Sequence, residues 1–317
     1  MPRRLGDIGE FGVIARIERI AERVQGRSVE LGIGDDAAVL RPPPGERLLV
    51  STDALVENVH FRWATQAPVT VGRRALAANL SDLAAMGGRP LGFVLALAAP
   101  PSLPVATLDG VARGLTAEAR RYACPLVGGN VTRAQRTSLT LTVLGAARPG
   151  RILTRSGTRV GDRILVTGSP GAVALEVARG GRVRRVPRPR IEAGRALARL
   201  PKVGGCIDVS DGLGADLGHL LAAASGGPLA AELEQARIPV PRGFKAACRR
   251  AGLDPERLAL QGGEDYELLF TLGSDAGCAL SEMALSRRLG LPVTEVGRIC
   301  RRPGLHGLPL RGGWRHY

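Results

Sequence analysis

The chain has 317 residues, of which 44% are hydrophobic, and its formal net charge at pH 7 is +15. This length allows two domains with cores of their own, and the composition excludes a disordered protein. The longest apolar run, residues 91–99, is too short to cross a membrane, which takes roughly twenty residues.

The first half of the chain alternates helical and strand-like patterns. Apolar residues recur at helical spacing in three segments, and the second of these ends at the helix-terminating pair Gly87-Gly88. Continuous or alternating apolar residues predict four strands in the same half. The expected helices cover 8–25, 69–86 and 105–121, and the expected strands cover 47–56, 91–99, 124–129 and 138–147.

A break at Arg148-Pro149-Gly150 separates this half from the next. Beyond it we expect strands at 163–168 and 205–209, a helix beginning near 172, a helix at 213–225, and apolar segments at 267–272 and 293–299. The arginine-rich run 182–190 contains two prolines and is typical of a loop. Together these elements predict an α/β (mixed α+β) fold with domains at 1–149 and 150–317.

The cysteines and the N-terminus both indicate an intracellular protein. The five cysteines lie far apart and include no C-x-x-C pair, so neither a disulfide framework nor a zinc site is expected. The first residues, MPRRLGD, contain neither the apolar core nor the cleavage site of a signal peptide. We expect a cytoplasmic protein with buried free thiols and no membrane association.

The positive charge raises the question of nucleic-acid binding. Lys202 and Lys245 are the only lysines, so nearly all of this charge is arginine, which indicates a general compositional bias. Aromatic residues make up 3% of the chain, and platforms for stacking bases are therefore scarce. We expect no nucleic-acid partner, while a basic nucleic-acid-binding protein stays open as the alternative from another functional class.

Acidic residues are fewer, yet several lie at the ends of apolar strands or in glycine-flanked turns. This set comprises Asp35-Asp36, Asp53, Asp82, Asp208, Asp211 and Glu264-Asp265. A carboxylate beside apolar residues is costly to desolvate unless it is paired or binds a cation. Hard oxygen ligands suit Mg²⁺, which commonly bridges phosphates in phosphoryl transfer. The alternative for each residue taken alone is that it caps a helix or a turn.

The sequence contains neither a Walker A motif nor the glycine loop of protein kinases, so a nucleotide would bind in another way. Gly128-Gly129-Asn130 and Gly168-Ser169-Pro170-Gly171 are candidate phosphate-facing turns, because glycine lets backbone N–H groups approach an anion. Either segment could equally be an ordinary turn.

Six motifs in this order give the sequence a family resemblance that covers nearly the whole chain: GIGDDAA, STDALVENVHF, NLSDLAAMG, LTRSG, DVSDGL and GGEDYELLF. The series resembles the thiamine-monophosphate kinases, within the aminoimidazole-ribonucleotide synthetase superfamily. The resemblance implies a two-domain α/β fold, pairing of N-terminal domains in a homodimer, and phosphorylation of thiamine phosphate by ATP to give thiamine diphosphate. The N-terminal domain would then bind ATP and Mg²⁺, and the C-terminal domain would complete the nucleotide and substrate sites.

The resemblance also implies roles for individual residues. The positions that match Mg²⁺ ligands are Asp36, Ser51, Thr52, Asp53, Asp82, Asp208 and Asp211, together with Asn130. The positions that match ATP contacts are Gly129, Asn130, Arg155 and Ser210, and those that match thiamine phosphate contacts are His60, Glu264 and Trp314. From the residues alone, His60 between apolar positions is as well explained as a structural histidine.

One position departs from the family pattern. Where the family usually has Gly-Gly-Asp-Thr, this chain has Gly129-Asn130-Val131, so a neutral amide replaces a metal-binding carboxylate. We expect weaker affinity at one Mg²⁺ site or a slower enzyme. The aspartates otherwise suggest one distributed magnesium site to which both domains contribute.

The expected reaction is a direct, in-line transfer without a phosphorylated enzyme, in which metal ions and positioning supply the catalysis. The nearest alternative is another ATP-dependent member of the superfamily. A selenophosphate synthetase would need a reactive Cys near its N-terminus, and here the first is Cys124. An amidine-forming synthetase would lack the GGEDYEL segment and the terminal aromatic residue.

Overall fold

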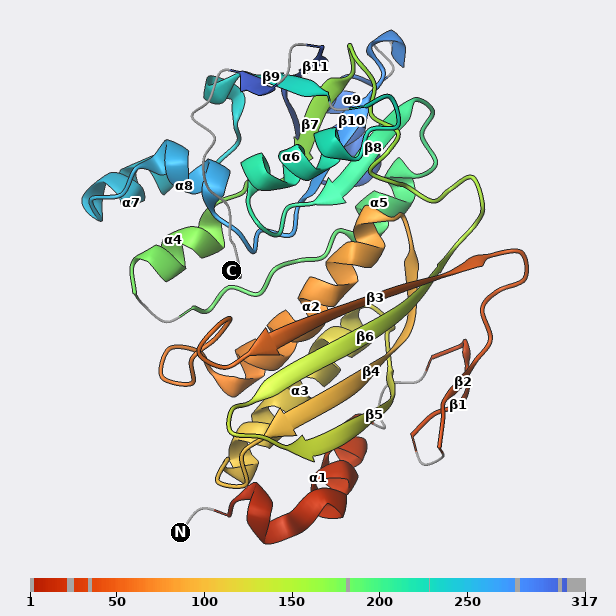
Figure 1. Cartoon of the computed structure of the whole chain (residues 1–317), viewed down its shortest axis with the longest axis vertical. Coiled ribbons are helices and arrows are strands. Elements are labelled where there is room, and N and C mark those ends of the chain that lie inside the picture. Colours follow the sequence, from red (N-terminus) through yellow and green to blue (C-terminus); the bar gives the residue numbers. More distant parts are fainter. Residues whose placement is uncertain are drawn as a thin grey trace. The chain divides into compact units, whose positions relative to one another are not determined.

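The computed structural model describes residues 3–21, 26–33, 36–180, 183–227, 229–276, 280–301 and 304–306 (Figure 1). The chain divides into two compact units. Unit 1 comprises Met1–Leu83, Arg89–Pro149 and Arg182–Val186, and unit 2 comprises Ala84–Gly88, Gly150–Gly181 and Pro187–Tyr317. Each unit therefore contains a short piece of the other's half of the sequence.

Unit 1 is built on a four-stranded mixed sheet with the order β3-β6-β4-β5 (Figure 1). The central pairs are antiparallel, and β4 and β5 run parallel. The helix α1 contacts α3 and β5, and a two-stranded sheet of β1 and β2 completes the unit. The elements are α1 (Leu5–Ala21), β1 (Val29–Leu31), β2 (Val39–Leu40), β3 (Arg47–Val56), α2 (Pro68–Ala85), β4 (Arg89–Ala99), α3 (Val105–Arg121), β5 (Leu126–Arg133) and β6 (Ser138–Ala147).

The two faces of this sheet differ in exposure. Side chains alternate along a strand, and on one face Leu139, Leu141 and Val143 are fully buried. On the other face, Leu48 and Val50 of β3 are 49% and 60% exposed. We call these the covered face and the open face of the unit 1 sheet.

Unit 2 has a mixed sheet with the order β12-β9-β11-β7-β10-β8, and its described residues form six α-helices. The apolar sides of α6, α7 and α8 share one buried cluster with the central strands. The strands are β7 (Arg163–Thr167), β8 (Val203–Asp208), β9 (Ala230–Leu233), β10 (Leu268–Leu272), β11 (Val293–Cys300) and β12 (Gly304–His306). The helices are α4 (Ala172–Ala178), α5 (Ile191–Leu197), α6 (Leu213–Ala222), α7 (Phe244–Arg250), α8 (Pro255–Gln261) and α9 (Glu282–Leu289).

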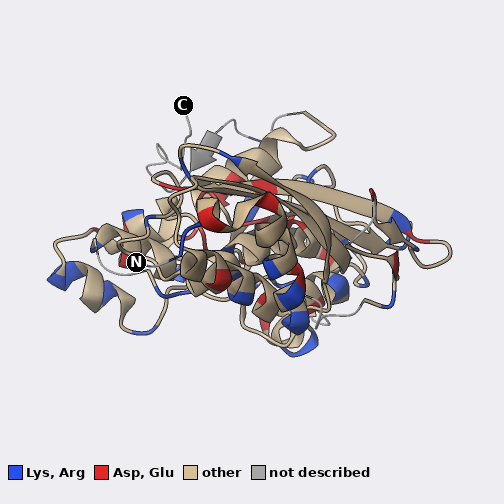
Figure 2. Cartoon of the chain, turned by 90° about the horizontal axis from the view of Figure 1, so that it is seen from below, with Lys and Arg blue, Asp and Glu red and all other residues tan. Residues whose placement is uncertain are grey.

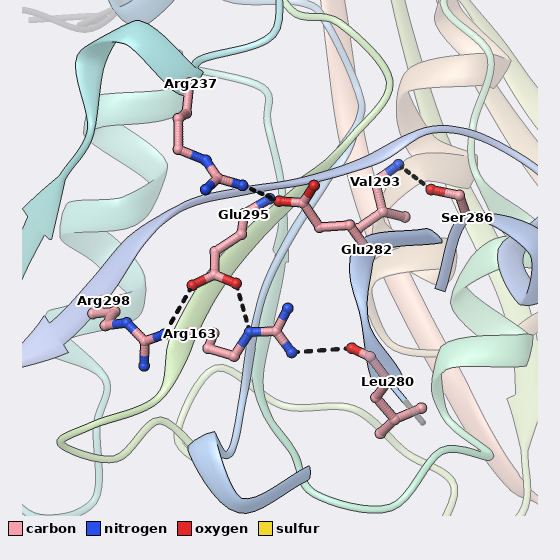
Figure 3. Close-up of polar contacts among 8 residues, drawn as sticks. All are labelled: Arg163, Arg237, Leu280, Glu282, Ser286, Val293, Glu295 and Arg298. Carbon is pink, nitrogen blue, oxygen red and sulfur yellow. Dashed lines mark hydrogen bonds and ion pairs between the residues drawn. The ribbon is translucent and has the colours of Figure 1, made fainter. Parts of the chain in front are cut away.

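Ion pairs and hydrogen bonds connect β7, β11 and α9 within unit 2 (Figure 3). Arg163 binds Glu295 at 2.6 Å and the carbonyl of Leu280 at 3.0 Å. Glu282 of α9 accepts the backbone N–H of Glu295 at 2.7 Å and also pairs with Arg237. These acids are paired with arginines that lie on the same sheet or its connections, so we assign them a structural role.

The structure confirms the predicted mixed α/β fold and most of the predicted elements. In the first half, the helix 105–121 and the strand 138–147 agree to the residue. The sequence prediction missed β1, β2, β9, β12 and the short helices α5, α7, α8 and α9, whose patterns are too brief to stand out. Among the described helices, none is both long and apolar enough to span a bilayer.

Two further expectations concern cysteine and charge. Cys124, Cys206 and Cys248 are buried free thiols, as expected, whereas Cys300 is a free thiol that is only half-buried. Cys278 lies outside the described residues. Figure 2 shows Lys and Arg on helices and loops in many parts of the chain, which agrees with a general arginine bias.

Candidate functional site

In unit 1, β3 and α2 bring two of the expected metal-binding residues together. The hydroxyl of Ser51 donates to the carboxylate of Asp82 at 2.5 Å. Asp53, two residues further along β3, lies on the same covered face. Asp53 and Asp82 therefore lie inside a strand and a helix, not at the strand ends or turns that the sequence suggested.

Asn130 lies far from these residues on the same sheet. The register places Asp53 in a cross-strand row with Leu141, Leu95 and Gly129, whereas Asn130 belongs to the next row, on the open face. β3 and β5 are the two edge strands, so three spacings of about 4.8 Å separate them by roughly 14 Å. Because Mg²⁺ binds oxygen at about 2.1 Å, one ion cannot contact both residues of a single chain.

The segment Gly128-Gly129-Asn130 is part of β5 and not a phosphate-facing turn. A Cβ atom at Gly129 would lie 2.1 Å from the carbonyl oxygen of Leu95 on the neighbouring strand. Close packing of β4 against β5 therefore explains this glycine, and the expected turn at this position was wrong.

The remaining expected residues of unit 1 have local contacts. The hydroxyl of Thr52 donates to the carbonyl of Leu141 at 3.0 Å on the sheet itself. His60 Nδ1 accepts the backbone N–H of Val56 at 3.0 Å, which leaves the proton of the neutral ring on Nε2. This contact supports the structural interpretation of His60 and leaves its predicted substrate contact untested. Asp36 is exposed in a bend before β2.

In unit 2 the expected metal ligands lie at the end of β8 and in the loop that follows it. Asp208 ends the strand and is 4% exposed, and Asp211 lies just before α6. The carboxylate of Asp216 accepts the backbone N–H groups of Asp211 at 3.0 Å and Gly212 at 3.1 Å. Burial, then the charges of Asp208 and Asp211, raise the pKa of Asp216 to about 7. Asp216 thus holds the loop that carries the expected ligands.

The glycine in this loop has a steric reason. Gly212 has a φ angle of 114°, and a Cβ atom there would lie 2.9 Å from the carbonyl carbon of Gln261. The left-handed backbone and the close approach together require glycine. The turn between β8 and α6 is therefore held by the Asp216 carboxylate and also packed closely against Gln261.

The GGEDYEL segment is bound directly to this loop. The backbone N–H of Glu264 donates to Ser210 O, and that of Tyr266 donates to Val209 O, both at 2.7 Å. Val209 in turn donates to Glu267 O at 2.8 Å. The expected ATP contact Ser210 and the expected substrate contact Glu264 are therefore joined by one hydrogen bond.

Two further acids of this segment have protein partners. Asp265 accepts the backbone N–H of Gly171 at 2.8 Å, and burial raises its pKa to about 8. The buried carboxylate of Glu267 binds the guanidinium of Arg190 at 2.7 and 2.5 Å and the hydroxyl of Thr167 at 2.7 Å. For Asp265, which the sequence placed among the candidate cation-binding acids, the structure supports the alternative of a cap.

The second candidate phosphate-facing turn is also occupied by protein contacts. Gly168 donates its N–H to Pro292 O at 2.9 Å, and Gly171 donates to Asp265. A Cβ atom at Gly168 would lie 2.0 Å from Glu267 Oε1, so packing explains this glycine. These contacts favour the alternative that this segment is an ordinary turn.

The other expected residues lie elsewhere or beyond the described chain. Arg155 is exposed, and its carbonyl oxygen would lie 2.7 Å from a Cβ atom placed on Gly205, in the first half of β8. Trp314 and Asp35 lie outside the described residues. Their expected roles stay predictions.

The chemical groups of the expected ligands suit Mg²⁺. The residues expected to bind it offer carboxylate and hydroxyl oxygens, which are the hard ligands that Mg²⁺ prefers. Within the described part of the chain, no three His, Cys, Asp or Glu side chains lie close enough together to hold a metal ion. Such a set suits ions that take one or two protein ligands each and the rest from water and substrate phosphates.

Sequence reasoning missed Asp216, Glu267 and Arg190 as parts of this framework. Asp216 carried a usable signal, since an acid in the first turn of a helix commonly binds free backbone N–H groups. The pairing of Arg190 with Glu267 spans 77 residues and has no local signal.

Comparisons with known proteins give a consistent result. Residues 34–147 match the family described as AIR synthase related protein, N-terminal domain. The thiamine-monophosphate kinase of Escherichia coli K12 is 41% identical, over 98% of this chain and 97% of that protein. A crystal structure of thiamine-monophosphate kinase from Stenotrophomonas maltophilia K279a has a TM-score of 0.78 and 35% identity, covering 94% of this chain and 96% of that one. A structure described as AaThiL complexed with AMPPCP and TMP has a TM-score of 0.74 and 28% identity, with 99% of both chains covered.

Proposed function

The chain belongs to the thiamine-monophosphate kinase family, and we propose that it phosphorylates thiamine phosphate with ATP to give thiamine diphosphate and ADP. The observation that carries this proposal is the 41% identity to the Escherichia coli enzyme over nearly the full length of both chains. A related structure with AMPPCP and TMP supports ATP and thiamine phosphate as the ligands. The arrangement in unit 2, where Ser210 and Glu264 are directly hydrogen-bonded, agrees with two ligands that react with each other.

The reaction needs little proton transfer. The phosphate oxygen of thiamine phosphate, ionised near neutral pH, forms a bond to the γ-phosphorus of ATP while the bond to the β–γ bridging oxygen breaks, and ADP leaves with that electron pair. Arg155 and Ser210 would hold the nucleotide. Glu264 would face the cationic thiazolium ring, where opposite charges attract. These groups act by orientation and electrostatics, so we expect no phosphorylated enzyme.

Mg²⁺ would be held by Asp82, Asp53 and Ser51 in unit 1 and by Asp208 and Asp211 in unit 2, and it would neutralise part of the phosphate charge of both substrates. Asp216 would keep Asp211 in place through the backbone N–H that it accepts. The prediction of one metal site shared by both halves stays a prediction, as does the cytoplasmic location.

We also propose that the enzyme acts as a homodimer whose unit 1 sheets are in contact. The exposed Leu48 and Val50 on the open face are an apolar surface that a second copy would cover. Sedimentation of the purified protein tests the dimer, and a monomer at micromolar concentration would count against it.

A direct assay tests the activity. Purified protein is incubated with ATP, Mg²⁺ and thiamine phosphate, and thiamine diphosphate is detected by chromatography. We expect product only when all three are present and none when thiamine phosphate is omitted. Failure to form thiamine diphosphate under these conditions would refute the proposed function.

A further inference from the structure

The segment Glu264–Tyr266 has a backbone conformation that needs outside support. Glu264 and Tyr266 have φ angles of 65° and 52°, in the left-handed region that residues other than glycine rarely adopt. Such conformations persist where the surrounding structure holds them, and they gather at functional sites. The contacts of this segment therefore identify the residues on which the position of Glu264 depends.

The segment is fixed from two directions. On one side, the N–H groups of Glu264 and Tyr266 donate to the carbonyl groups of Ser210 and Val209. On the other side, the carboxylate of Asp265 accepts the N–H of Gly171 at 2.8 Å, just before α4. Asp265, between the two residues with positive φ angles, thus directs its side chain towards α4. Its neighbours Glu264 and Tyr266 keep their backbone hydrogen bonds to the β8–α6 loop.

The donor of the Asp265 contact is itself held in place. Gly171 has a φ angle of 100°, and a Cβ atom there would lie 2.8 Å from the ring of Phe244 in α7. Phe244 is 2% exposed and belongs to the buried cluster of unit 2. The N–H of Gly171 is therefore a fixed point of the core, against which Asp265 can anchor the segment.

Building on the kinase function proposed above, we propose that Asp265 is a positioning residue of the thiamine phosphate site, which holds Glu264 in place by binding the N–H of Gly171. Asp265 acts through its neighbour and does not touch the substrate. Loss of this bond frees the strained backbone to relax towards ordinary φ angles and moves the Glu264 carboxylate away from the substrate. The bond to Ser210 remains, so ATP binding is affected much less.

Steady-state kinetics of four variants test this inference. We expect Asp265→Ala to raise KM for thiamine phosphate by about tenfold or more and KM for ATP by less than about threefold. Asp265→Asn keeps a carbonyl oxygen for the Gly171 N–H and should stay within about threefold of the wild type. In the Glu264→Ala background, Asp265→Ala should add no further rise in KM, because it acts through a side chain that is already absent.

The matched control is Asp254→Ala. Asp254 caps α8 in the same unit by accepting the N–H of Glu256 at 2.9 Å, and it has no bond to the Glu264 segment. We expect this variant to lower the melting temperature and leave both KM values unchanged. If Asp265→Ala is not recovered folded, Asp265→Ser takes its place with the same expectation.

Three results would overturn the inference: an unchanged KM for thiamine phosphate in Asp265→Ala, equal rises in both KM values, or an additive effect in the Glu264→Ala background. Each requires an active wild-type enzyme. A wild type that forms no thiamine diphosphate refutes the proposed function instead, so the two failures are distinguishable.

Discussion

The ion pair between Arg190 and Glu267 should be one of the most costly contacts of unit 2 to break. The Glu267 side chain is 7% exposed and binds Arg190 through two hydrogen bonds, and Thr167 donates a third. Arg190→Met keeps most of the apolar stem and removes every N–H of the guanidinium. The carboxylate is then left buried with one hydroxyl partner.

The expected loss can be estimated from the geometry. Removing one partner of a buried, hydrogen-bonded ion pair typically costs about 3–5 kcal/mol. Because the Arg190 side chain is 25% exposed, water partly replaces it, and we expect the lower end, about 3 kcal/mol. This amount shifts the folding equilibrium by a factor on the order of 100.

Urea unfolding followed by circular dichroism measures this loss. The double variant Arg190→Met/Glu267→Gln should lose at least about 1 kcal/mol less than the sum of the two single variants, because the stranded charge is gone. The control is Arg195→Met, which breaks an ion pair with Glu192, itself 81% exposed, and should cost less than about 0.5 kcal/mol. Equal losses for Arg190→Met and Arg195→Met, or strict additivity in the double variant, would refute the reasoning.

Three further predictions concern the metal and pH. Asn130→Asp should lower the Mg²⁺ concentration needed for half-maximal activity by about tenfold, since it restores a carboxylate; an unchanged Mg²⁺ titration would count against the role of this position. Asp82→Asn should lower kcat/KM by about 100-fold or more without a matching loss of melting temperature, and full activity would exclude Asp82 from metal binding. The raised pKa of Asp265 means that the folded state holds this proton up to about pH 8, whereas the unfolded chain releases it near 4, so its stabilising effect is lost as pH rises through that window. Asp265→Asn, whose amide does not titrate, should therefore gain stability relative to the wild type as pH rises from about 4 to about 8; parallel pH profiles of the two proteins in chemical denaturation would contradict this.

The sequence predicted the fold well where its patterns were long. Segments such as 105–121 and 138–147 hold one period over ten or more residues, so burial of one face determines the element. Short helices such as α7 and α8 have about two turns each, and their apolar residues resemble those of any partly buried loop. These elements depend on the buried cluster of unit 2, which forms only when distant segments meet.

The sequence predicted which kinds of side chain belong to the candidate site, but it predicted their positions in space less well. The acids of DVSDGL and GGEDYEL could be identified as a set, and the structure does bring Ser210 and Glu264 into contact. Sequence spacing could not show that Asn130 lies on the opposite edge and face from Asp53, because cross-strand register is set by the whole sheet. Nor could it separate a candidate acid that binds a backbone N–H group, such as Asp265, from the acids that we propose as cation ligands.

The interleaving of the two units in sequence has a consequence during synthesis on the ribosome. Val183, a buried residue of unit 1, donates its N–H to Thr65 O at 3.2 Å, although unit 2 has already begun at Gly150. The nascent N-terminal unit therefore cannot finish folding when residue 149 emerges, and it must wait for some 37 more residues to leave the exit tunnel. During that interval the carbonyl group of Thr65 lacks the N–H of Val183 that it accepts in the finished unit. A split gene that ends at residue 149 should yield a fragment that depends on chaperones, which pulse-chase solubility measurements of the two lengths, 149 and 186, would reveal.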